Sequence, residues 1–319
     1  MKHVFIINPA AGKTNRTREI FQMAEQLRSR HDLDCQCILT RQPGHATEIS
    51  RQLVQTGEPI RLYACGGDGT MNEVANGIVG ADNAAMTCIP VGTGNDFLKN
   101  FGTDLPKFND AENLWDGPQH ALDVIDCNGR YALTIACSGI DARIAADVHK
   151  YSSRPLLDGK SSYIYSLAVN FLFKGIASQW TVTVDGASVV GDYSLVAVCN
   201  GRYYGGGFMP VGEARMDDGV LNTLIVKGVN RRTFLKFVGP YSKGGYRQFP
   251  HVAKCVTGKV IRIQAMDQDI VTCLDGEILR SRDVTIRLAD QKLNFFGPQG
   301  CDCNATALSA RPADKACVY

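Results

Sequence analysis

Three short segments in the first hundred residues combine glycine with polar side chains in a pattern suited to binding phosphate. They are NPAAGK at 8–13, GGDGT at 66–70 and GTGND at 92–96. Glycines let backbone N–H groups approach an anion closely, and a helix N-terminus favours phosphate. Asp68 would repel a phosphate unless a metal ion lies between them, so GGDGT predicts a site for a magnesium nucleotide. Any one such loop is as often a plain tight turn.

Two common phosphate-binding motifs are not met. Gly12-Lys13-Thr14 has the end of a P-loop, but that motif needs glycine at position 7, where the chain has Ile7. The dinucleotide pattern G-x-G-x-x-G begins at Gly92 and again at Gly67, but its third glycine is replaced by Phe97 and Asn72 respectively. The sequence therefore excludes an ordinary P-loop NTPase and an ordinary NAD dehydrogenase.

The elements that must position these loops alternate between strand and helix. Short β-rich runs at 3–7, 32–39, 61–65 and 85–91 are separated by helical periodicity near 20–27 and at 45–55 and 71–79. This predicts an open, doubly wound parallel sheet with a Rossmann-like order. Because such a sheet gathers the carboxyl ends of its strands at one edge, the loops 8–13, 66–70 and 92–96 and Thr40 are expected to meet there.

The second half is rich in β pattern, with helical stretches only at 142–174 and 230–245. We expect a mostly antiparallel β-sandwich. The predicted domains are 1–123, which binds nucleotide, and 124–297, followed by a loose tail at 298–319. The apolar run 163–173 suggests a core helix or the wall of a lipid-entry groove. The basic segment 230–247 reads as a solvated amphipathic helix, with membrane contact as the alternative.

Two acidic turns in the second half have an ordinary structural explanation. Asp275-Gly276 joins two β-rich runs and suits a type I′ hairpin turn, as Asp185-Gly186 does between two others. Asp217-Asp218-Gly219 also reads as a turn. The residues alone therefore favour turns over chemistry at all three places.

Composition narrows the class of protein. Of 319 residues, 34 are Lys or Arg and 32 are Asp or Glu, a net charge of +2, which is too balanced for a nucleic-acid binder recognised by charge alone. The 12 cysteines form no C-x-x-C pair and mostly lie in apolar runs, which predicts reduced thiols in a cytosolic protein. No apolar stretch is long enough for a transmembrane segment or a signal peptide.

Five segments resemble, in order, the motifs of the diacylglycerol kinase-type lipid kinases, a family that includes sphingosine and ceramide kinases. They are NPAAGK at 8–13, GGDGTMNEV at 66–74, PVGTGNDF at 90–97, NGRYYGGGFMPVGEARMDDGVL at 200–221 and LDGE at 274–277. The resemblance covers about residues 3–297. It implies a fold like that of NAD kinase and diacylglycerol kinase, with the active site in the cleft between the two domains.

The resemblance also implies the cofactors ATP and Mg²⁺ and a role for each motif. Glu277 would accept the proton of the acceptor hydroxyl, with Asp275 beside it. Asp68 and Asp96 would interact with Mg²⁺ and the phosphates. Asp218 would bind a structural Mg²⁺ through its carboxylate. Arg215 and Val220 would bind that ion through their main-chain oxygens. The residues that would line the nucleotide are Asn8, Pro9, Ala10, Ala11, Gly12, Lys13, Thr40, Gly66, Gly67, Asp68, Gly69, Thr70, Met71, Asn72, Thr93, Gly94, Asn95 and Asp96.

The predicted activity is transfer of the γ-phosphate of ATP to a lipid hydroxyl, with diacylglycerol as the expected acceptor and phosphatidic acid as the product. A sphingoid base or phosphatidylglycerol is the alternative acceptor. NAD kinase is the next alternative, although such an enzyme should carry an Asn-Glu motif in its second half and no Asn-Glu pair occurs after Asn72-Glu73. A non-catalytic nucleotide-binding regulator is the last alternative. The expected place is the cytoplasm, peripheral at the inner membrane face, with the oligomeric state, a dimer included, left open.

Overall fold

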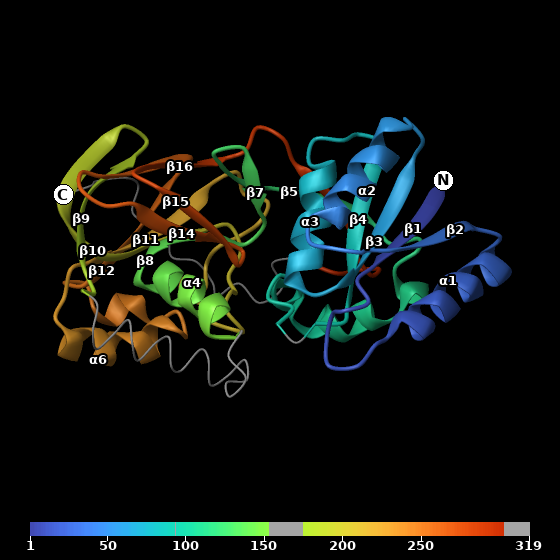
Figure 1. Ribbon diagram of the computed structural model, residues 1–319, viewed down its shortest axis with the longest axis horizontal. Coiled ribbons are helices and arrows are strands. Elements are labelled where there is room, and N and C mark those ends of the chain that lie inside the picture. Colours follow the sequence, from blue (N-terminus) through green and yellow to red (C-terminus); the bar gives the residue numbers. More distant parts are fainter. Residues whose placement is uncertain (93, 153–174, 303–319) are drawn as a thin grey trace.

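The computed structural model describes residues 1–92, 94–152 and 175–302 of the chain. Two regions lie next to each other along the long axis of the molecule (Figure 1). The first is an α/β region, and the second is built mainly from antiparallel strands. The predicted run at 163–173, Thr93 and most of the predicted tail lie outside the described residues.

The first region is organised around a six-stranded sheet in the order β2-β1-β3-β4-β17-β5. Strands β1 to β4 are parallel, and the residues of β4 are buried throughout, as expected for a sheet covered on both faces. The elements are β1 (Lys2–Ile7), α1 (Thr17–His31), β2 (Asp34–Leu39), α2 (His45–Gln55), β3 (Ile60–Gly66), α3 (Asp68–Ile78), β4 (Ala84–Pro90) and β5 (Gln119–Leu122).

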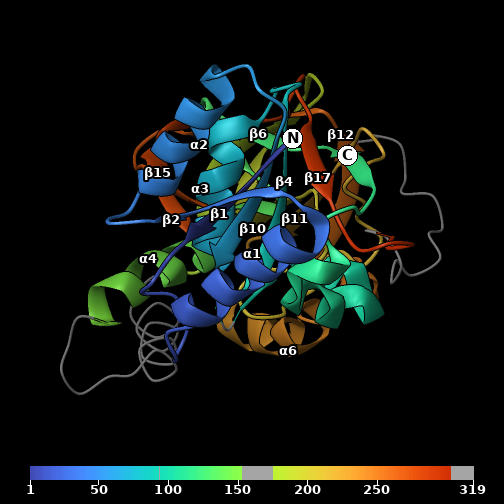
Figure 2. The same cartoon turned by 90° about the vertical axis from the view of Figure 1, so that its right-hand side faces the viewer.

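The helices divide between the two faces of this sheet because of the strand order. The chain moves from β1 outward to β2, and then back across the sheet to β3 and β4. Right-handed crossovers therefore place α1 on one face and α2 with α3 on the other, as Figure 2 shows. The predicted doubly wound arrangement is confirmed, and the loops after β1, β3 and β4 lie at one edge.

The end of the chain returns to this first sheet. Strand β17 (Leu293–Phe296) pairs in parallel with β4 and antiparallel with β5, although the sequence placed it with the second domain. Its aromatic residues Phe295 and Phe296 are fully buried there. Cys301, in the segment predicted to be a loose tail, is also buried in this core. The reason is that β17 fills the edge that β4 would otherwise leave open.

The second region is an antiparallel β-sandwich, as predicted. Its strands form one continuous sheet. The long strand β10 pairs with β9 along its first half and with β8 and β11 along its second half, so it connects the layers. Its strands are β6 (Ile125–Cys127), β7 (Arg130–Ala132), β8 (Ile135–Gly139), β9 (Ser178–Val184), β10 (Ala187–Cys199), β11 (Leu221–Lys227), β12 (Ala253–Gly258), β13 (Val260–Ala265), β14 (Ile270–Leu274), β15 (Glu277–Ser281) and β16 (Asp283–Leu288).

Two helices cover one side of the sandwich. They are α4 (Ile140–Ser152) and α6 (Arg231–Tyr241), where the sequence predicted helix. The described residues also include the 3₁₀ segments η1 (Leu98–Asn109), η2 (Ala111–Asn113) and η3 (Tyr246–Gln248). Within the described residues, no helix is both long and apolar enough to span a bilayer. All ten cysteines of the described part are free thiols and nine are buried, as predicted for residues that pack as small hydrophobes.

Candidate active site

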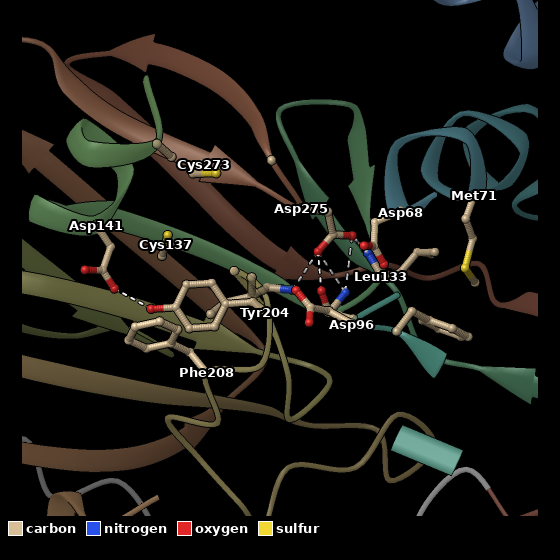
Figure 3. A pocket seen from close by; sticks show the side chains of 16 residues that line it. Asp68, Met71, Asp96, Leu133, Cys137, Asp141, Tyr204, Phe208, Cys273 and Asp275 are labelled. Carbon is tan, nitrogen blue, oxygen red and sulfur yellow. Dashed lines mark hydrogen bonds between the residues drawn. The ribbon is translucent and has the colours of Figure 1, made fainter. Parts of the chain in front are cut away.

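A pocket of about 250 Å³ lies where the two regions meet. The first region contributes the start of α3 and the loop after β4, and the second contributes β8, the β14–β15 turn and the loop 203–208. Figure 3 shows three carboxylates, Asp68, Asp96 and Asp275, gathered at one end of this pocket. Asp68 and Asp275 are 207 residues apart in sequence, so their proximity depends on the tertiary structure.

Asp68 is the first residue of α3 and points into the pocket. Burial raises the pKa of its carboxyl, and the negative charges of Asp96 and Asp275 act in the same direction. Backbone N–H groups of Phe97 and Asp96 oppose this by donating hydrogen bonds to it. A half-buried carboxylate among other carboxylates is an environment that a divalent cation would stabilise.

The predicted nucleotide loops pack directly against one another, and this explains their glycines. A Cβ on Gly12 would lie 2.3 Å from the Val91 carbonyl oxygen, and one on Gly92 would lie 2.7 Å from Gly67 Cα. A Cβ on Gly94 would lie 2.6 Å from Asp68 Oδ2. At Gly12 and Gly92 the contact is with backbone, so only glycine permits the approach, whereas a side chain at position 94 would displace the Asp68 carboxylate. The loops are therefore held in one shared cradle.

Asn8 connects the first loop of this cradle to the second. Its amide Nδ2 donates to Thr70 Oγ1 at 3.0 Å, and its Oδ1 accepts from the Ala10 N–H at 3.0 Å. Thr40 follows β2, and its N–H donates to the Ile7 carbonyl at 2.8 Å. Lys13 is exposed at the end of the first loop. The structure thus brings the predicted segments 8–13, 66–72 and 94–96 and Thr40 to one edge of the sheet.

Asp96 joins the two regions of the molecule. Its Oδ1 forms an ion pair with Lys99 Nζ at 2.5 Å, and its Oδ2 accepts from the Gly206 N–H at 2.7 Å. Nearby, the guanidinium of the fully buried Arg202 donates to Asn100. The sequence predicted a role for Asp96 but missed Lys99 and the contact with the loop 203–208.

Asp275 is the most heavily hydrogen-bonded carboxylate in the pocket. It accepts from the N–H groups of Leu133, Thr134 and Ile135, from the Thr134 hydroxyl and from Asn72 Nδ2. The Asn72 contact, at 3.3 Å, comes from α3 of the first region. Burial raises the pKa of Asp275, while these hydrogen bonds act in the opposite direction. Its oxygens are thus committed to holding the β14–β15 turn against both regions.

Glu277 differs from Asp275 in every one of these respects. It begins β15 directly opposite Leu274, so its side chain leaves the hairpin on the face opposite to that of the pocket-lining Cys273. It is exposed and does not line the pocket, and its side chain forms no hydrogen bond or ion pair within the described part of the chain. The structure places the two residues predicted for proton transfer side by side, but only Asp275 inside the pocket.

Comparisons with known proteins can now be set beside this geometry. The model of the diacylglycerol kinase catalytic domain matches residues 2–127. The model of the YegS C-terminal NAD kinase beta sandwich-like domain matches residues 134–297, more than half of the chain. The chain belongs to the diacylglycerol kinase-like family of lipid kinases. It is therefore a kinase by family, as the sequence motifs indicated.

Individual relatives agree with this assignment. A Staphylococcus haemolyticus protein provisionally named a lipid kinase is 30% identical over 74% of this chain and 75% of its own. A Staphylococcus carnosus protein with the same provisional name is 24% identical over 92% and 95%. A crystal structure of a protein from Bacillus anthracis, provisionally named a diacylglycerol kinase, has a TM-score of 0.73 at 23% identity and covers 93% and 96%. That likeness shows the shared fold.

Asp141 and Tyr204 line the end of the pocket away from Asp275, and Tyr241, which does not line it, hydrogen-bonds to both. Tyr204 and Tyr241 both donate to Asp141 Oδ2, and their hydroxyl oxygens lie 2.6 Å apart. Burial raises the pKa of Asp141, and the two hydroxyl donors lower it. Apolar side chains such as Phe208, Ala145 and Leu133 line the space between this group and Asp275.

The sequence did not predict this group. Tyr204 lies in the segment GRYYGGGF, which contributed to the family resemblance, but no role followed from it. The sequence did offer one signal for Asp141. This residue follows a buried strand and lies at the start of a helix, in a region otherwise rich in β pattern. A residue between a strand and a helix lies at the end of a sheet.

The predicted structural Mg²⁺ site has donors of the required kind. Asp218 is exposed at the surface, where partial desolvation raises the pKa of its carboxyl and Asp123 and Asp217 act in the same direction. One of its oxygens accepts from the Val220 N–H at 3.2 Å. One carboxylate and two carbonyls fit a magnesium ion that keeps several waters. Among the described residues, no group of three or more acidic, His or Cys side chains is arranged to hold a metal.

Proposed function

We propose that this protein transfers the γ-phosphate of ATP to the hydroxyl of a lipid, with Mg²⁺ as the metal ion and diacylglycerol as the acceptor expected from the family resemblance. One observation carries the proposal: the carboxylates Asp68, Asp96 and Asp275 stand at the junction of a glycine-lined cradle and an apolar pocket. Such a junction suits the meeting of a phosphate donor with a lipid alcohol. The site would operate at the cytoplasmic face of a membrane.

In this proposal the cradle holds the nucleotide. The backbone of segments 8–13, 66–72 and 93–96, with Thr40, surrounds the phosphates, and Asp68 and Asp96 are the ligands for the metal ion. Mg²⁺ supplies positive charge that offsets the charge developing on the transferred phosphoryl group. Arg215, Asp218 and Val220 would hold the second, structural Mg²⁺ away from the transferred group.

Proton transfer falls to the β14–β15 turn. The oxygens of Asp275 already accept hydrogen bonds from four residues, so its role is to position the turn. Glu277, whose side chain has no such partners within the described residues, is the proposed proton acceptor, which requires the lipid hydroxyl to lie beside the turn and outside the pocket. The pocket of about 250 Å³ then receives only the part of the acceptor next to its hydroxyl, since a diacyl lipid is several times larger.

The experiment that tests this function is transfer of labelled γ-phosphate from Mg–ATP to lipids in mixed micelles. The panel contains diacylglycerol, a sphingoid base and phosphatidylglycerol, with NAD as a soluble acceptor. We expect labelled phosphatidic acid, and a loss of at least about a hundredfold in kcat/KM for Asp68→Asn. The matched control is Asp82→Asn, which changes an exposed aspartate after the same helix.

Each other outcome has a distinct meaning. Label in a different lipid would keep the reaction and change the acceptor. Label in NAD alone would contradict the lipid kinase reaction, and full activity of Asp68→Asn would remove the metal role of that carboxylate.

A further inference from the structure

The basic residues of the second region are concentrated in one stretch of chain. From Gly219 to Met266 the sequence has nine Lys or Arg and no Asp or Glu, although the whole chain has 34 basic and 32 acidic residues. This stretch contains α6 and the strands β11 and β12 on which it lies. Acids from outside the stretch pair with two of these cations, Glu213 with Arg247 and Asp283 with Arg262, so only part of this positive charge is offset.

Helix α6 separates apolar from basic side chains by face. Phe234, Phe237 and Tyr241 are buried and attach the helix to the sandwich. The outer side carries Arg232, Leu235, Lys236 and, just beyond the helix, Lys243, all exposed. We call these four residues the docking face. Leu235 is 62% exposed, a large apolar side chain set between cations.

The cations of the docking face are not paired with acids in the part of the chain that the structure describes. Within the described residues, Arg232, Lys236 and Lys243 form no ion pair, whereas helix α1 offsets its basic side chains with Glu19 and Glu25. A surface that combines uncompensated cations with an exposed leucine suits an anionic bilayer. The leucine can enter the acyl boundary while the cations meet the lipid headgroups.

The docking face is connected to the active-site pocket through the same helix. Tyr241 donates to Asp141 Oδ2 at 3.0 Å on the inner side of α6, and Asp141 lines the pocket. Both views place α6 on the same side of the molecule as α4, which carries Asp141 (Figures 1 and 2). A bilayer against the outer side of α6 would thus be separated from the Asp141 end of the pocket by the helix and the Tyr241 side chain.

We propose that α6 binds this protein to anionic phospholipid bilayers through Arg232, Leu235, Lys236 and Lys243. The proposal deepens the proposed function, since a lipid kinase must reach an acceptor held in a membrane. Each cation near an anionic surface contributes about 1 kcal/mol, equivalent to about fivefold in partitioning. Several cations with one inserted leucine are enough for reversible binding.

The test is flotation of the full chain with vesicles of phosphatidylcholine alone or with about 30 mol% phosphatidylglycerol. We expect binding to the anionic vesicles only, weakened at high salt. The double variant Arg232→Glu/Lys236→Glu should lower the partition coefficient by about thirtyfold or more, and Leu235→Ser by about fivefold to tenfold. The matched control, Arg18→Glu/Phe21→Ser, alters an exposed cation and an exposed aromatic residue on α1 and should bind as the parent does.

A second readout separates this inference from the proposed function. Each variant is also assayed with a short-chain acceptor dissolved as monomers, for which the docking-face variants should keep parental activity. Equal vesicle binding by the parent and the α6 variants would overturn the inference even if lipid phosphorylation is observed. Binding that depends on α6 without any lipid phosphorylation would uphold it and contradict the proposed function. Preference for a DNA duplex over anionic vesicles would also overturn it.

Discussion

Two Asp-Gly turns in the second region have nearly the same backbone and very different surroundings. Asp185 and Asp275 have φ values of 46° and 47°, and the glycines that follow have 88° and 105°. Both carboxylates accept hydrogen bonds from backbone N–H groups of another segment, Asp185 from Lys259 and Val260, and Asp275 from residues 133–135. The local chemistry of the turn is therefore shared.

The two turns differ in what lies around them. Asp185 is exposed at the edge of the sandwich, whereas Asp275 lines the pocket and also accepts from Asn72 of the first region. The residue after glycine is Ala187 in one turn and Glu277 in the other. The comparison shows that an Asp-Gly turn is a structural device whose functional value depends on its location.

The largest expected effect comes from removing the carboxylate of each turn. Asp275→Ala should lower kcat/KM by about a thousandfold and destabilise the protein by about 2–4 kcal/mol, because it leaves several half-buried donors without an acceptor. Asp185→Ala should leave kcat/KM within about twofold and cost about 1 kcal/mol. Urea unfolding and phosphoryl transfer on both variants measure this. Equal effects of the two substitutions would show that location does not matter.

A smaller effect is expected from exchanging the residue after glycine. Glu277→Ala gives the pocket turn the Asp-Gly-Ala sequence of the other, and should lower kcat by about a hundredfold or more with the free energy of unfolding unchanged within about 0.5 kcal/mol. The reverse change, Ala187→Glu, should alter neither quantity. Unchanged kcat for Glu277→Ala would mean that the pocket turn is purely structural and that Glu277 is not the proton acceptor.

The smallest expected effect is a pH dependence of stability. Burial raises the pKa of Asp275 above its ordinary value of 3.8, so the folded state binds more protons than the unfolded state just above that pH. The contribution of this group to stability is therefore fully present below pH 3.8 and is lost as the pH rises through the folded pKa. Relative to Asp275→Asn, the parent should lose stability on going from acid toward neutral pH. Urea unfolding of both proteins across this range measures the difference, and the opposite slope would contradict the effect of burial.

Most of the first region was predictable from the sequence. The strands and helices of residues 2–90 lie close to their predicted positions, since alternating apolar periods and short connections leave one favourable arrangement, the doubly wound sheet. The β-sandwich was predictable as a class from its many short β-rich runs. The pairing of its strands was not, because residues far apart in sequence choose one another by side-chain packing and register.

The sequence predicted part of how the site residues meet. The strand order predicted that the loops of Asp68 and Asp96 share one sheet edge, and the family resemblance placed Asp275 in the same cleft, but the return of β17 to the first sheet carried no local signal. Folding placed the three carboxylates around one pocket, put Asp141 and Tyr204 at its other end, and put Glu277 on the hairpin face opposite to that of Cys273. The physical reason is that periodicity and turn chemistry act over a few residues, whereas burial, charge proximity and hydrogen bonding between Asp275 and Asn72 depend on contacts made across the whole chain.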